Sequence, residues 1–141
     1  MPPSRENAVK AQLITTGHCK AHWTITLSEP GRCINANLEL NSLKWSQGHP
    51  ALLLKTIEFR VTDHYPGVEE MKGCLWPPEH LMERQGQCHC AQWVWAVIWD
   101  YGKRGYVEEV SREEVPLTNL LDQLVGIQSG VHALLSLLAN R

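Results

Sequence analysis

The sequence lacks the segments that export and membrane insertion require. Residues 1–7 include two prolines and no apolar core of the kind a signal peptide needs. The longest uninterrupted apolar run, Trp93–Trp99, is far shorter than the roughly 18 residues of a membrane span. Five cysteines are an odd number for a chain without a secretory signal, so we do not expect a disulfide framework. These absences predict a soluble protein in a reducing compartment, the cytoplasm, with no membrane partner.

Common catalytic motifs and an excess of one charge are also missing. The sequence has no phosphate-binding glycine loop, no Gly-x-Ser-x-Gly elbow and no His-Glu-x-x-His zinc motif. The net charge of −2 argues against a dedicated nucleic-acid binder, which normally carries a basic excess. The sequence therefore gives no support for a nucleotide-binding protein, an esterase or a zinc protease of the His-Glu-x-x-His class. Nucleic-acid binding is disfavoured.

Length and composition predict a single domain over residues 1–141. The chain is long enough to bury a core, and its 43% hydrophobic and 20% charged residues are typical of a globular protein. Within this domain we expect a flexible lead-in over residues 1–7 and a C-terminal helix over residues 116–141.

Alternation of apolar and polar residues predicts strands in the N-terminal half. Ala21–Ser28 and Cys33–Leu40 alternate cleanly, and the Pro30-Gly31 pair between them is typical of a tight turn, so together they predict a β-hairpin. Val9–Thr16 is a strand or a short helix, with the strand favoured. Leu52–Thr62 predicts a long strand, and residues 41–50 predict a polar connection.

Periodicity alone cannot assign Trp93–Trp99. The run is apolar at both parities, which fits a strand covered on both faces or a buried helix. The turn sequence Tyr101–Gly105 and a short strand expected at Tyr106–Val110 favour a second hairpin.

The C-terminal segment predicts a long helix with a continuous apolar seam. Its apolar residues are spaced alternately by three and four, and the segment carries almost no charge. Such a helix either docks on the sheet or is shared with a second copy of the chain as a homodimer. Gly126 and Gly130 each cost helix propensity, about 1 kcal/mol relative to alanine, but would let another backbone approach. The seam residues are Leu117, Leu120, Leu124, Ile127, Val131, Leu134 and Leu138.

These elements predict an α+β fold. We expect an antiparallel sheet of about five strands, covered on one face by the long C-terminal helix. An irregular proline-containing segment over Val68–Gln87 interrupts the strands.

Histidine and cysteine residues suggest a metal site. His18 and His22 would share one face of an extended segment, as would Cys88 and Cys90, and the four together would suit tetrahedral zinc. Alternatively, the cysteines are small buried hydrophobic residues, or Cys74 or Cys88 pairs with a histidine in a thiol enzyme.

The leading hypothesis is a small non-catalytic protein-binding module of the inhibitor, adaptor or immunity-protein type, with no cofactor. Aromatic residues in loops are frequent anchors in protein interfaces. One alternative is a zinc-binding protein or small zinc or thiol enzyme, and another is an RNA or single-strand binder. The expected partner-binding residues are Trp45, Tyr65, Trp76, Tyr101, Lys103 and Arg104.

Overall fold

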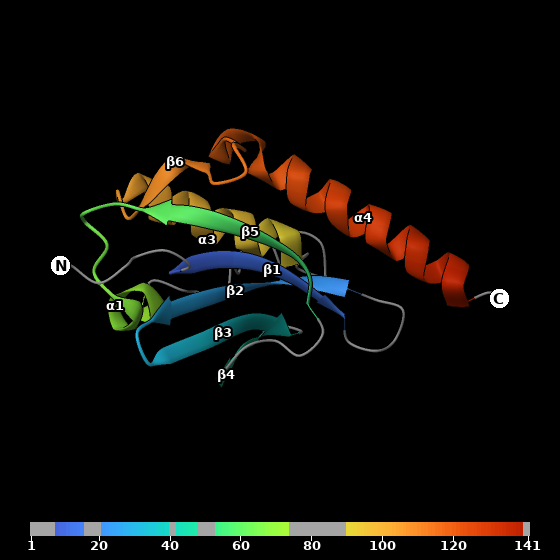
Figure 1. Cartoon of the computed structure of the whole chain (residues 1–141), viewed down its shortest axis with the longest axis horizontal. Coiled ribbons are helices and arrows are strands. Elements are labelled where there is room, and N and C mark those ends of the chain that lie inside the picture. The colour runs from blue at the N-terminus through green and yellow to red at the C-terminus, as the bar shows by residue number, and fades with distance from the viewer. Residues whose placement is uncertain (1–7, 16–20, 40–41, 48–52, 74–89, 140–141) are drawn as a thin grey trace.

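The fold is α+β, and its strands form an antiparallel sheet (Figure 1). The computed structural model describes residues 8–15, 21–39, 42–47, 53–73 and 90–139. In these ranges six strands lie in the order β4-β3-β2-β1-β5-β6. The strands are β1 (Val9–Thr15), β2 (Ala21–Glu29), β3 (Arg32–Glu39), β4 (Ser42–Gln47), β5 (Leu53–Val61) and β6 (Val107–Ser111).

The predicted hairpin is confirmed as β2 and β3. Leu27 pairs with Ile34, and Gly31 closes the turn with a φ of 79°, a conformation that glycine adopts without strain. The predicted strands at Val9–Thr16 and Leu52–Thr62 are confirmed as β1 and β5.

The sixth strand is β4, which corrects the predicted polar connection over residues 41–50. β4 pairs with β3 along its length, with Trp45 opposite Ala36. A strand at the edge of a sheet needs one hydrogen-bonded neighbour and little apolar alternation, so its polar sequence resembles that of a loop.

Trp93–Trp99 is helical, which corrects the predicted second hairpin. It lies within α3 (Cys90–Lys103). Trp93, Val97 and Tyr101 are buried at intervals of four residues, the spacing of one helix face. The predicted strand at Tyr106–Val110 does form, as β6, but it pairs with β5.

The helices cover the apolar face of the sheet. Alternate residues of β2, namely Trp23, Ile25 and Leu27, are buried in one core cluster with the inner face of α3. A short helix, α1 (Val68–Gly73), joins the same core through Val68 and Met71. The opposite sheet face carries buried polar residues that hydrogen-bond one another, as Thr26 and Gln12 do at 2.6 Å. The opposite face therefore buries polar side chains that satisfy one another by hydrogen bonds.

The predicted C-terminal helix is α4 (Leu120–Ala139), preceded by a 3₁₀ turn, η1 (Leu117–Asn119). Leu117, Leu120 and Leu124, the first three residues of the seam, are buried. Leu134 and Leu138, its last two residues, are 57% and 56% exposed. Figure 1 shows the reason, because α4 runs on past the end of the sheet.

Candidate functional site

Side chains of α3 and α4 complete the hydrogen bonding of β2 where β3 stops pairing with it. Among the described residues, the β2–β3 register begins at Ile25, so β3 does not pair with the earlier residues of β2. The Ala21 N–H donates to His132 Nε2 at 2.9 Å, and Gln128 Nε2 donates to the Ala21 carbonyl at 2.8 Å. The Trp23 N–H donates to Cys90 Sγ at 3.3 Å. Because buried backbone groups need partners, these bonds hold the middle of α4 against the sheet.

Beyond this attachment, α4 presents an apolar surface to solvent. Leu134, Leu137 and Leu138 form this surface, which we call the α4 leucine surface, and Leu137 is the most exposed at 69%. Together with half-buried Leu135, these side chains span roughly half of the helix circumference, since each residue turns about 100°. An apolar sector this wide normally faces a core.

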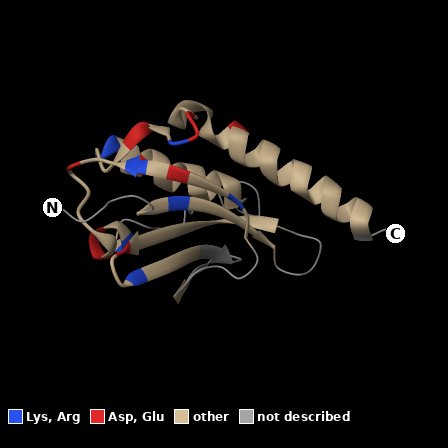
Figure 2. Cartoon of the chain, in the orientation of Figure 1, with Lys and Arg blue, Asp and Glu red and all other residues tan. Residues whose placement is uncertain are grey.

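The helix that carries the leucine surface has almost no charge. No lysine, arginine, aspartate or glutamate lies between Gln123 and Ala139. Figure 2 shows the charged residues gathered over the other parts of the fold, with this length of α4 bare of them.

Two glycines continue the leucine surface toward the middle of the helix. Gly126, Gly130, Leu134 and Leu138 follow one another at intervals of four and so form a single row along α4. A Cβ placed on Gly126 or Gly130 would meet nothing within 4 Å. The row therefore consists of two positions without a side chain, which we call hollows, followed by two exposed leucines.

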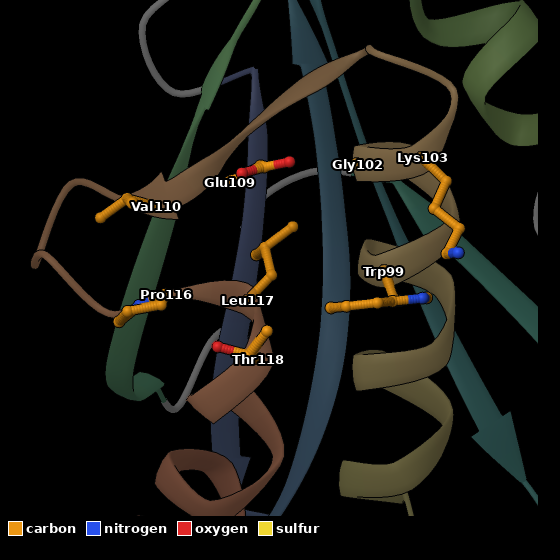
Figure 3. A pocket seen from close by; sticks show the side chains of 8 residues that line it. All are labelled: Trp99, Gly102, Lys103, Glu109, Val110, Pro116, Leu117 and Thr118. Atoms are coloured by element: carbon orange, nitrogen blue, oxygen red, sulfur yellow. The ribbon is translucent and has the colours of Figure 1, made fainter.

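A separate pocket of about 330 Å³ lies between α3, β6 and η1 (Figure 3). The Lys103 ammonium lies 5.5 Å from the centre of the Trp99 ring, and Glu109 supplies a carboxylate at the wall. None of the eight described residues that line the pocket is serine, cysteine or histidine. An aromatic ring beside an ammonium and a carboxylate suits the binding of a small chemical group. The lining residues are Trp99, Gly102, Lys103, Glu109, Val110, Pro116, Leu117 and Thr118.

The predicted zinc ligands are not brought together in the described part of the chain. His18 and Cys88 lie outside the described residues. Trp23 of β2 faces the helices, so its neighbour His22 points to the opposite sheet face, whereas Cys90 begins α3 on the helical side. The described residues include no group of three or more potential ligands. The zinc site stays a prediction that rests on the two undescribed ligands.

The predicted aromatic surface is divided. Trp76 lies outside the described residues. Trp45 is half-buried in β4, not in a loop, and the Lys72 ammonium lies 5.1 Å from its ring centre. The Tyr65 hydroxyl is buried with no hydrogen-bond partner among the described residues, and burial, together with the nearby Glu29 charge, raises its pKa to about 12.

Tyr101 corrects the prediction of an exposed aromatic turn. It belongs to the last part of α3, is fully buried, and donates a hydrogen bond to the Met71 carbonyl at 2.8 Å. Lys103 and Arg104 are exposed, and the Arg104 guanidinium pairs with Asp100 at 2.8 Å. Of the predicted partner-binding residues that the structure describes, only Lys103 and Arg104 form an exposed feature, next to the pocket.

Within the described residues, no helix combines the length and the hydropathy needed to cross a membrane. Comparison of the chain with protein-family models, with curated protein sequences and with solved structures gave no match.

Proposed function

We propose that this protein is a non-catalytic protein-binding module whose contact surface is the α4 leucine surface. The observation that carries the proposal is the exposure of Leu134, Leu137 and Leu138 side by side on one helix. Burying one leucine side chain contributes about 1.5–3 kcal/mol, so covering three of them would provide substantial binding energy. Contiguous apolar patches of this kind mark interaction sites, whereas single exposed leucines do not.

The spacing of the three leucines suits recognition of another protein chain. They occupy positions i, i+3 and i+4, the pattern by which a helix anchors its apolar face in a groove or against a second helix. The complementary partner surface is apolar and uncharged, because α4 offers no charged side chain there. Gln128 donates a hydrogen bond to the Ala21 carbonyl and His132 accepts one from the Ala21 N–H, and these bonds hold the helix in place before the partner arrives. A helix already held in place loses less entropy on binding.

The competing functions have less support in the described residues. The pocket lining offers no thiol, imidazole or serine hydroxyl for a thiol or zinc enzyme. A nucleic-acid binder normally carries a basic excess, whereas the net charge of this chain is −2. We place the module in the cytoplasm because five cysteines, an odd number, do not suit a disulfide framework and fit a reducing compartment.

Site-specific photo-crosslinking tests the proposal. A photoreactive phenylalanine analogue replaces Leu137 in one sample and Leu54, an exposed leucine of β5, in the control. In extract from the source cells we expect position 137 to crosslink to a protein of one discrete mass, and position 54 not to. Excess wild-type protein should compete for this product, and the Leu134→Glu/Leu138→Glu protein should not. Equal crosslinking from both positions, or none from position 137, contradicts the proposal.

A further inference from the structure

We propose that the α4 leucine surface binds a second copy of this chain, forming a two-fold symmetric dimer with antiparallel α4 helices. This inference rests on the proposed function, because it names the partner of the same surface.

The row along α4 is complementary to itself. In an antiparallel pair centred near His132, Leu134 of each copy lies opposite Gly130 of the other, and Leu138 lies opposite Gly126. The leucines of one helix then fill the hollows of its partner. Packing of such rows spaced by four residues is the commonest way in which two helices meet in globular proteins.

The glycines are explained by this arrangement and by nothing inside the described part of the chain. Glycine in a helix costs about 1 kcal/mol relative to alanine. A side chain at Gly126 or Gly130 would enter open space, so no described neighbour requires a glycine at either position. A second helix crossing at these positions would require it, because a Cβ there would hold the two backbones apart.

The charge distribution also favours a second copy over an unlike partner. Interfaces between unlike proteins normally use charged residues around an apolar centre to select partner and orientation. From Gln123 to Ala139 the helix has no charged side chain, so two copies meet without like-charge repulsion. The partner is therefore selected by shape alone. The shape that fits the exposed leucines, the pair of hollows at Gly126 and Gly130, is present on the same helix.

The expected dimer is concentration-dependent. Residues 126–138 span roughly 20 Å of helix, a shorter contact than the roughly 800 Å² per partner of a typical stable complex provides. We therefore expect monomer and dimer to exchange, with a two-fold interface in which each residue contact occurs twice.

Sedimentation equilibrium of the full chain over a wide range of concentrations tests the inference. We expect the wild-type mass to rise from 16.0 kDa toward twice that value. Leu134→Glu/Leu138→Glu should remain monomeric, and the matched control Leu54→Glu should associate like the wild type. Circular dichroism and thermal unfolding check that each variant is folded, and Leu137→Glu replaces Leu134→Glu/Leu138→Glu if that variant does not fold.

A second variant separates shape-specific pairing from general stickiness. Gly126→Leu/Gly130→Leu adds apolar surface and fills both hollows, into space that is open in the single chain. We expect its dimer dissociation constant to rise at least about tenfold. Association that becomes tighter in this variant would overturn the inference.

The outcomes distinguish this inference from the proposed function. A wild-type chain that stays monomeric at every concentration overturns self-association. If position 137 then still crosslinks to one discrete protein, the binding function stands with an unlike partner. If it crosslinks to nothing, both fail. A dimer that persists in folded Leu134→Glu/Leu138→Glu uses another surface and also overturns the inference.

Discussion

The indole N–H of Trp23 donates a buried hydrogen bond to the carbonyl of Leu124, at 2.9 Å. This bond joins β2 to α4 across 101 residues of sequence. Both side chains are fully buried, so the bond lies inside the core that the sheet and the two long helices share. The position of α4, and with it the direction in which the leucine surface points, depends on this contact and on the nearby Gln128 and His132 bonds.

Replacing Trp23 with phenylalanine removes this bond and leaves a cavity. We expect the free energy of unfolding to fall by about 2–4 kcal/mol, since a lost hydrogen bond and a smaller buried ring both contribute. Urea denaturation followed by circular dichroism measures the change. Trp99→Phe, at a half-buried pocket position, is the control and should cost less. Equal losses would show that the Trp23–Leu124 bond contributes little.

Gln128→Ala tests the attachment of α4 to the start of β2. The substitution removes the donor to the Ala21 carbonyl, and we expect a loss of about 1 kcal/mol in unfolding free energy. Hydrogen exchange of the α4 amides should accelerate from residue 128 onward, because the helix loses part of its anchor. Gln123→Ala, at an exposed position on the same helix, should leave both measurements unchanged.

Gly102→Ala should destabilise the contact between α3 and η1. A Cβ on Gly102 would lie 2.6 Å from Leu117 Cδ1, so the buried Leu117 side chain must move. We expect a cost of about 1–3 kcal/mol in thermal or urea unfolding. Gly73→Ala is the matched control, since its Cβ would meet nothing within 4 Å. A neutral Gly102→Ala would mean that η1 can shift freely.

The raised pKa of Tyr65 leads us to expect a loss of folding stability at alkaline pH. Its pKa is raised to about 12 by burial and by the Glu29 charge, while the unfolded chain has the ordinary value of 10.0. Between these values the unfolded state loses the proton first, so stability falls as pH rises from 10 toward 12. Below pH 10 both states hold the proton and this contribution vanishes.

Tyr65→Phe checks that prediction through unfolding measured as a function of pH. We expect the variant to lose the alkaline decline that Tyr65 causes. At neutral pH it should be as stable as the wild type or more so, because the buried hydroxyl has no hydrogen-bond partner among the described residues. Tyr106→Phe serves as the control and should retain the decline. An unchanged pH profile in Tyr65→Phe would assign the decline to another group.

Local sequence patterns determined the hairpin, the strand β5 and the helix α4. Alternation over Ala21–Ser28 and Cys33–Leu40 is a property of the chain itself, because a strand with one buried face must place apolar residues at every second position. The three-and-four spacing from Leu117 to Leu138 determined a helix in the same way. The sequence also shows that α4 carries almost no charge. It does not show whether the helix docks on the sheet or remains exposed.

Only the tertiary structure decided the remaining elements, because each depends on what a distant segment covers. Trp93–Trp99 is apolar in every direction and became a helix where one face of the sheet required a cover. Tyr101 is buried for the same reason, as the last inward residue of that helix. The seam of α4 continues unchanged in sequence while the sheet beneath it ends, so identical leucines are buried at position 124 and exposed at position 138. A periodic pattern specifies which side of a helix is apolar, and only the folded neighbours determine how much of that side is covered.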